Sequence, residues 1–365
     1  MKKFAIYLPQ FHEIQENNRW WGDGFTEWVK VKEGKSLYKG HLQPKAPLND
    51  NYYDLLDEKT VVWQDKLLKQ YGIDGLIYYH YYFCGKKLLE KPAENLLKNK
   101  EIKHKFFFCW ANHTWCRSWN GSKEVLMEQT YGTISDWKVH FDYLLEFFKD
   151  ERYEKRNNKP LLMIHNSNFA EKKEMINYLN NRCKECGFNG ICLIEVYRGA
   201  RLKDCGTNFK EQLLPETELV YYREPEVAFN INKRKICNIP THLIQKIKRI
   251  IINRTKISNP KVEKILERCT ERYDGNKFFD IMIKEEPIGE GIVRGLFFEW
   301  DNTPRHSYRG YVIDPPDKKH FDAFMETVKN DEYIFINAWN EWAEGMMLEP
   351  TKQNEYRYLE WLKEW

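Results

Sequence analysis

Eight short runs of β-branched, aliphatic or aromatic residues recur along the 365-residue chain, and segments with helical periodicity separate them. This alternation is typical of parallel strands joined by crossover helices. The predicted strands are Phe4–Leu8, Gly75–Tyr79, Phe106–Trp110, Leu161–His165, Ile191–Val196, Leu219–Tyr222, Gly295–Glu299 and Tyr333–Asn337. The predicted helices are Thr60–Tyr71, Asp136–Lys149, Glu171–Cys186, His242–Arg254, Lys318–Val328 and Asn354–Lys363. Eight strands with intervening helices predict an α/β fold, a (β/α)8 TIM barrel with elaborated βα loops.

The length is compatible with one such barrel carrying insertions, so we predict a single catalytic domain over residues 1–365. A basic helical insertion is expected around residues 230–275. Within it, apolar residues such as Ile247 and Ile250 repeat at helical spacing between lysines. We favour an amphipathic helix packed on the barrel. Association with an anionic membrane surface is the second interpretation.

Composition excludes several classes of protein. The net charge of +4 is the difference between 58 basic and 54 acidic residues, which gives no electrostatic reason to expect a nucleic-acid partner. No run of 18 uncharged apolar residues occurs, and the N-terminal apolar stretch is too short for a secretory signal. Nine cysteines without disulfide-scaffold spacing predict reduced thiols and a cytoplasmic location. Cys183 and Cys186 have no second pair at zinc-site spacing, so neither a metal nor a cofactor is predicted.

Polar and aromatic residues follow every predicted strand. In a barrel these positions meet at the rim formed by the carboxyl ends of the strands, where reacting groups gather. The long connection from Glu13 to Asp57 is rich in aromatic residues, and we expect it to fold over this rim. The predicted substrate-binding residues are His12, Trp28, His80, Tyr81, Trp110, Asn112, Glu299, Trp339, Asn340 and Trp342.

The segment from Trp339 to Gly345 follows the eighth strand and contains two carboxylates between indoles. Cleavage of a glycosidic bond uses one carboxyl group as a proton donor and a second as base or nucleophile, while flat rings hold the sugar. Glu341 and Glu344 are therefore the predicted catalytic pair. The alternative interpretation is a solvated pair at a helix start, where negative charge suits the helix dipole.

Several motifs resemble those of WbsX-like proteins of surface-polysaccharide gene clusters, which are related to glycoside hydrolase family 99. The motifs are Tyr7-Leu8-Pro9-Gln10-Phe11-His12, Gly24-Phe25-Thr26-Glu27-Trp28, Tyr79-His80-Tyr81-Tyr82-Phe83, Cys109-Trp110-Ala111-Asn112, Trp300-Asp301-Asn302-Thr303-Pro304-Arg305 and Asn340-Glu341-Trp342-Ala343-Glu344-Gly345. The resemblance implies a (β/α)8 barrel that acts on α-linked, often mannose-type, glycans with retention of configuration. It also implies that Glu341 assists the sugar 2-hydroxyl and that Glu344 acts as general acid and then base.

The predicted function is thus that of a carbohydrate-active enzyme of cell-surface polysaccharide metabolism, such as lipopolysaccharide O-antigen or capsule. Its expected partner is an oligosaccharide or polysaccharide, which could be lipid-linked. A glycosyltransferase or transglycosylase is the first alternative, although the chain has no Asp-x-Asp motif and no Gly-rich phosphate loop. A non-catalytic glycan-binding protein is the second.

Overall fold

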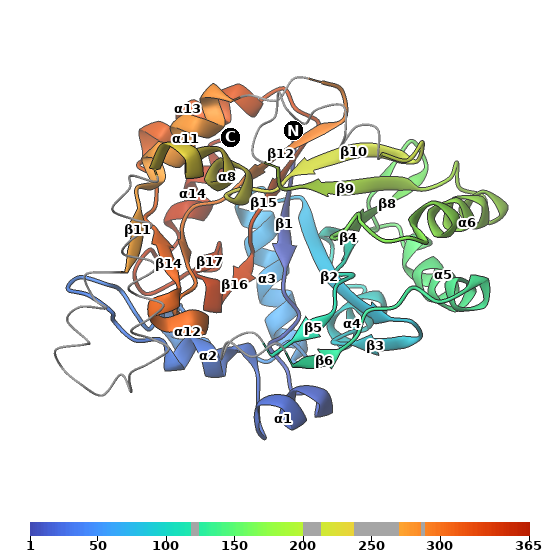
Figure 1. Ribbon diagram of the computed structural model, residues 1–365, viewed down its shortest axis with the longest axis horizontal. Coiled ribbons are helices and arrows are strands. Elements are labelled where there is room, and N and C mark those ends of the chain that lie inside the picture. The colour runs from blue at the N-terminus through green and yellow to red at the C-terminus, as the bar shows by residue number, and fades with distance from the viewer. Residues whose placement is uncertain (118–123, 200–212, 237–269, 286–288) are drawn as a thin grey trace.

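The structure is a computed structural model that describes residues 1–117, 124–199, 213–236, 270–285 and 289–365. Eight parallel strands form a closed ring, because β1 pairs with both β2 and β15 (Figure 1). Around the ring the strands are β1 (Lys2–Tyr7), β2 (Gly75–Phe83), β4 (Lys105–Trp110), β8 (Lys159–Ile164), β9 (Cys192–Tyr197), β10 (Thr217–Tyr222), β12 (Ile292–Leu296) and β15 (Tyr333–Ile336). The predicted (β/α)8 barrel is confirmed, and each of its eight strands corresponds to a predicted apolar run.

The seventh strand differs from its predicted bounds. It was expected over Gly295–Glu299 but β12 spans Ile292–Leu296, three residues earlier at each end. Arg294 lies inside this strand, and its guanidinium bonds to Asp331 and Thr327 outside the ring. A charged residue therefore interrupts the apolar run that would have marked the start of the strand. The shift leaves Glu299 beyond the end of β12.

Aromatic rings fill the interior of the barrel. The ring of Phe107 on β4 lies 5.3 Å from Phe4 on β1 and 5.5 Å from Phe335 on β15, measured between centroids. Phe335 also packs against Tyr221 on β10 at 5.3 Å. Since these strands are not all neighbours in the ring, the contacts cross the barrel. The interior is a packed core, and the open space lies above it at one end.

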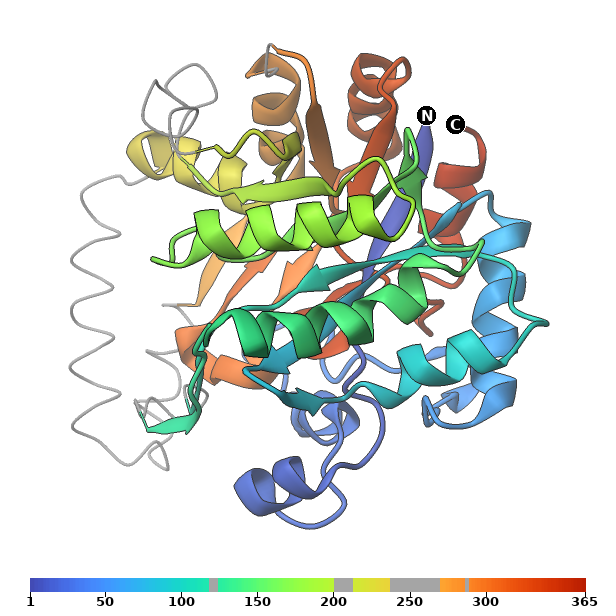
Figure 2. The ribbon, with the colours of Figure 1, turned by 90° about the vertical axis from the view of Figure 1, so that its right-hand side faces the viewer.

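Helices cover the outside of the strands, and Figure 2 shows α5 and α6 running side by side along this surface. Each begins where the chain leaves a strand, and α5 has a capping box between Thr133 and Asp136. Five predicted helices are present as α3 (Glu58–Gln70), α5 (Ile134–Phe148), α6 (Lys172–Glu185), α13 (Lys318–Val328) and α14 (Arg357–Lys363). The predicted helix His242–Arg254 and most of the predicted insertion lie outside the described residues. The helices that were not predicted are α1 (Gln15–Trp21), α2 (Glu27–Glu33), α4 (Lys91–Lys98), α8 (Glu226–Ile236), α11 (Gly275–Lys284) and α12 (Thr303–His306).

The long first connection carries α1 and α2 to the end of the barrel at which the strands finish, as expected (Figure 1). Short strands and turns elaborate the same end: the hairpin of β5 (Trp115–Cys116) with β6 (Val125–Met127), the sheet of β11 (Glu271–Tyr273), β14 (Tyr311–Ile313) and β13 (Trp300–Asp301), and the pair β16 (Asn340–Glu341) with β17 (Met346–Met347) around η3 (Trp342–Glu344). The remaining short elements are β3 (Lys86–Leu88), β7 (Lys155–Arg156), η1 (Leu48–Asp50) and η2 (Ser307–Arg309). Within the described ranges, no helix combines the length and apolarity needed to cross a bilayer.

Candidate active site

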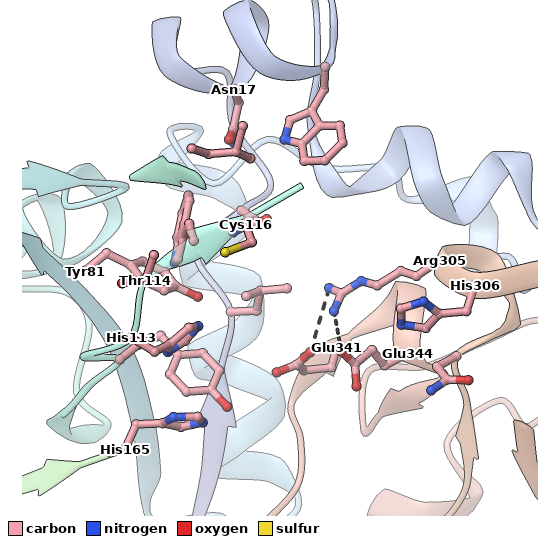
Figure 3. Close-up of a pocket in the computed structure, with 18 of the residues that line it drawn as sticks. Asn17, Tyr81, His113, Thr114, Cys116, His165, Arg305, His306, Glu341 and Glu344 are labelled. Carbon is pink, nitrogen blue, oxygen red and sulfur yellow. Dashed lines mark hydrogen bonds and ion pairs between the residues drawn. The ribbon is translucent and has the colours of Figure 1, made fainter. Parts of the chain in front are cut away.

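A cavity of about 490 Å³ opens at the carboxyl ends of the strands. Loops after strands on opposite sides of the ring contribute to it, which is the position of active sites in barrels of this kind. Figure 3 shows its lining, with Glu341, Glu344, Arg305 and His306 on one side and His113, His165 and Tyr81 on the other. The aromatic part of the lining consists of Trp21, Tyr79, Tyr81, Trp115 and Trp300.

The two predicted catalytic carboxylates face this cavity from a single turn. Glu341 ends β16, and Glu344 ends the 3-10 turn η3, so the backbone forms one tight turn rather than the start of an α-helix. Gly345 follows with φ of 64°, and a Cβ atom there would lie 2.7 Å from the backbone nitrogen of Asp301. Glycine is therefore required to close the turn, which holds both acids against the loop of β13.

Glu341 is the more buried of the two acids, with 6% of its side chain exposed compared with 21% for Glu344. Burial, followed by the negative charge of Glu344, raises the pKa of Glu341 to about 7. The nearby guanidiniums of Arg305 and Arg223 act in the opposite direction. A carboxyl group whose pKa lies near neutrality can exchange a proton with substrate at physiological pH.

Arg305 joins three carboxylates into one network. Its guanidinium contacts Glu344 and Glu27, and lies 3.9 Å from a carboxylate oxygen of Glu341. Glu27, the first residue of α2, is fully buried. Burial alone would lower the pKa of Arg305, but the negative charges of Glu27 and Glu344 outweigh this effect and raise it. Because Arg305 is anchored by Glu27 on α2, which follows the segment Gly24-Phe25-Thr26, its contact with Glu344 fixes the position of that carboxylate.

The opposite side of the cavity carries two arginines around one histidine. Arg198 and Arg223 approach the same atom, Nε2 of His165, at 2.7 and 2.9 Å. His113 packs against His165 with ring centroids 5.1 Å apart. Burial and then the two guanidinium charges lower the pKa of His165 and bring that of His113 to about 4, so both imidazoles are neutral at pH 7.

Known proteins resemble this chain in sequence and in fold. The family model described as Glycosyltransferase WbsX matches residues 3–362. The chain belongs to the WbsX family. This confirms the family resemblance, and with it the expectation of a carbohydrate-active family.

Relatives of this WbsX-family chain include the protein named "Uncharacterized protein WxcX" from two strains of Xanthomonas campestris pv. campestris. They are 28% identical over 370 residues in strain B100 and 27% identical over 369 residues in strain ATCC 33913. Each comparison covers 98% of this chain but 48% of the relative, so the chain spans about half the length of the curated relatives it matches.

Solved structures of similar fold include the GH99 endo-alpha-mannosidase from Bacteroides thetaiotaomicron, with a TM-score of 0.53 and 12% identity over 100% of this chain and 96% of that chain. A second, named a glycoside hydrolase-like protein, has a TM-score of 0.55 and 10% identity over 100% and 93% of the two chains. At this level of identity the likeness concerns the fold alone.

Three of the twelve predicted site residues line the cavity in this WbsX-family barrel: Glu341, Glu344 and Tyr81. The other nine do not line it, and their contact with substrate stays a prediction. Four of them hold the rim together. The Trp28 indole donates to the carbonyl of Tyr53, and the Trp342 indole to Glu349. The members of this buried group are Trp28, Trp339, Asn340 and Trp342.

The remaining five are turned away from the cavity or lie beside it. His80 alternates with Tyr79 and Tyr81 along β2, so its ring faces outwards and lies 2.9 Å from Nε2 of His140 on α5. Glu299 pairs with Lys45 at 2.8 Å in a separate hollow. The other three are the buried residues His12, Trp110 and Asn112, of which Trp110 donates to the carbonyl of Tyr82 and Asn112 to that of Asn166.

Several residues in or beside the cavity were not among the predicted site residues. Tyr79, His113, His165, Arg223 and Arg305 line it, while Arg198 contacts His165 and Glu27 contacts Arg305 from beside it. His165 is the last residue of a predicted strand, and His113, Arg198 and Arg223 come within three residues after one, so their position was the available signal. Glu27 and Arg305 lie within two of the family motifs, 19 and six residues after the nearest predicted strand. Among the residues that the structure describes, no three histidine, cysteine or acidic side chains gather as ligands for a metal.

Proposed function

We propose that this chain is a retaining, glycoside hydrolase family 99-like enzyme that acts on an α-linked, mannose-type glycan of a cell-surface polysaccharide. The observation that carries the proposal is the arrangement of Glu341, Glu344 and Arg305 in one aromatic-lined cavity at the carboxyl ends of the barrel strands. The family match supports the carbohydrate class, and the mannosidase neighbour supports the linkage only through its fold.

The chemistry assigns one role to each acid. Glu341 removes the proton of the sugar 2-hydroxyl, whose oxygen attacks the anomeric carbon while the bond to the leaving oxygen breaks. Glu344 gives its proton to that leaving oxygen, and a 1,2-anhydro sugar results. In the second step Glu344 takes a proton from the attacking hydroxyl, the C1–O2 bond opens, and Glu341 returns its proton to O2. Two inversions give net retention.

Burial supports this division of roles. A raised pKa makes the Glu341 carboxylate a stronger base than an ordinary glutamate once it is ionised. Glu344, which contacts Arg305, is more exposed than Glu341. It therefore lies nearer to solvent, from which the attacking hydroxyl group arrives. Tyr79 and Tyr81 place phenol rings beside the acids, which suits contact with the faces and hydroxyl groups of a sugar.

Transfer to a sugar hydroxyl is the second candidate function, because the matched family is described as glycosyltransferases. The first half-reaction is the same for hydrolysis and transfer. A screen of α-linked oligosaccharides, with and without acceptor sugars, separates the two by whether the product is a free reducing sugar or a longer glycan. Product anomers followed by NMR test retention, since an inverted first product contradicts the proposal.

Paired variants test the roles of the acids. Glu344→Gln is expected to lose activity on natural glycans and to keep much of it on a substrate with an aryl leaving group, which needs no proton. Glu341→Gln is expected to lose activity on both substrates by at least about a hundredfold. Glu33→Gln is the matched control, because that exposed carboxylate on α2 pairs only with Lys30 among the described residues. Binding of glycan without turnover in the unaltered protein would instead support a glycan-binding protein.

A further inference from the structure

The two arginines opposite the acids have more hydrogen-bond donors than the surrounding protein can satisfy. Nε2 of a neutral imidazole has a single lone pair, yet both Arg198 and Arg223 approach this atom of His165. Among the described residues, their other acceptors are the carbonyl oxygen of His165, at 2.9 Å from Arg198, and the carboxylate of Glu226. Two guanidiniums therefore converge on one imidazole nitrogen at the edge of the cavity.

The positive charge on this side of the cavity is only partly offset by negative side chains of the described residues. Glu226 lies 2.8 Å from Arg198 and 3.6 Å from Arg223, so in the described part of the chain one carboxylate lies within ion-pair distance of both permanent cations. His113 and His165 are neutral and supply no negative charge. Arg223 is nearly enclosed, with 10% of its side chain exposed. Leaving a net positive charge in such surroundings is unfavourable unless an anion arrives.

Neutral hydrogen-bonding atoms surround the two cations. His113 lines the cavity, and its imidazole has no hydrogen-bond partner among the described residues. The same cavity reaches Glu341 on the other side, so a ligand group held here belongs to the molecule that the acids contact. An oxyanion with two oxygens would accept from the arginines in the bidentate way that guanidinium favours.

We propose that His113, His165, Arg198 and Arg223 form an anion-binding wall that recognises the carboxylate of a uronic acid in the glycan. This inference rests on the proposed function, because it requires that the cavity binds a sugar. A carboxylate is preferred over a phosphate because the wall carries one net positive charge, two arginines against Glu226, and a carboxylate brings one negative charge. The structure thereby assigns acidic glycans as the substrate class.

Binding of simple glycosides tests the inference without turnover. The probes are methyl α-hexuronosides of gluco, galacto and manno configuration, each compared with the neutral methyl α-hexoside of the same configuration. Dissociation constants come from NMR titration of the whole protein. At least one uronoside is expected to bind about tenfold more tightly than its neutral partner, as hydrogen bonds to a charged group predict. The preference is expected to fall as salt is raised.

Arg198→Met and Arg223→Met are each expected to remove the preference for the acid. Arg198 is the first choice, because 32% of its side chain is exposed and its loss disturbs packing less. Thermal unfolding shows whether each variant is folded. Arg272→Met is the matched control, since that arginine pairs with Asp314 in a different hollow.

Four results overturn the inference: uronosides that bind no more tightly than neutral glycosides, a preference that survives both arginine variants, tighter binding of hexose 1-phosphates than of any uronoside, and no binding of any uronoside. Glu341→Gln separates this inference from the proposed function. That variant is expected to lose turnover and keep the preference for the acid. An active enzyme without the preference rejects the anion-binding wall alone, and a preference without any turnover rejects the enzyme alone.

Discussion

The side chain of Asn340 forms two hydrogen bonds with the backbone of Leu8. Its Oδ1 accepts from the Leu8 nitrogen at 2.7 Å, and its Nδ2 donates to the Leu8 oxygen at 3.0 Å. The amide therefore continues the hydrogen bonding of β1 after the strand itself has ended. Because Glu341 is the next residue, these bonds also fix the backbone position of this proposed catalytic residue.

Asn340→Ala is expected to lower the free energy of unfolding by about 3 kcal/mol, since it leaves two buried backbone groups of Leu8 without partners. Urea denaturation measures the loss. Asn181→Ala is the control, because the exposed Asn181 amide contacts only Asn177, at 3.5 Å. Equal stability of the two variants would show that water replaces the asparagine.

Arg305→Met is expected to destabilise the protein by about 3–5 kcal/mol, because the fully buried carboxylate of Glu27 loses its cation. The double variant Glu27→Gln with Arg305→Met is expected to recover part of this loss, as a double-mutant cycle would reveal. Lys138→Met, which removes an exposed pair with Asp142, is expected to have no measurable effect. Additive effects of the two site substitutions would contradict direct pairing.

On the acid side of its profile, activity is expected to rise with pH through about 7. Glu341 works as a base only when ionised, and burial followed by the charge of Glu344 raises its pKa to about 7. The acid limb of kcat/KM measures this pKa. Removing the positive charge of Arg223, which favours the ionised form, is expected to move the limb to higher pH. An acid limb at the ordinary value of glutamate, near about 4.3, would sink the assignment.

The free energy of unfolding, unlike the activity, is expected to fall as pH rises. Burial raises the pKa of Glu224 to about 8, so between the ordinary value of glutamate and pH 8 the folded state binds more protons than the unfolded state. The stabilisation is complete below about pH 4 and is lost as pH rises through 8. Glu224→Gln, measured by urea denaturation from pH 5 to 8, is expected to show a smaller decline than the unaltered protein. A parallel decline in both would exclude Glu224 as its source.

His80→Phe is expected to leave kcat/KM within about twofold and to lower stability by about 1–3 kcal/mol, because His140 loses its hydrogen-bond partner. Tyr81→Phe, the neighbouring substitution, changes a residue that lines the cavity and is expected to raise KM. Steady-state kinetics on the two variants test whether His80 contacts substrate, as the sequence predicted. A large rise in KM for His80→Phe would support that prediction.

The barrel could be predicted because each strand is a run of apolar and aromatic residues that must be buried on both faces. The exception was β12, where Arg294 satisfies its charge outside the ring and so breaks the run. Along β2 the alternation was also informative. Tyr79 and Tyr81 point into the cavity while His80 points to α5, which the two-residue repeat of a strand predicts and the site predictions did not use.

The pair of acids could be proposed because both lie in one four-residue segment, Glu341 to Glu344, after a single strand. Arg305 and Glu27 could not be found in this way, because they lie 36 and 314 residues from Glu341 and meet it only in space. The indoles near the acids were assigned to sugar contacts, but Trp28 and Trp342 pack on each other, 5.2 Å between centroids. Rim loops of this length need a core of their own, and the tryptophans supply it.

The position of β1 between β2 and β15 has a consequence for synthesis. A nascent chain that has reached residue 330 contains seven of the eight barrel strands. It lacks β15, which closes the ring by pairing with β1. Such a chain also lacks Glu341 and Glu344, which follow β15. In the enzyme as proposed, the segment that closes the ring is therefore followed directly by the two reacting acids.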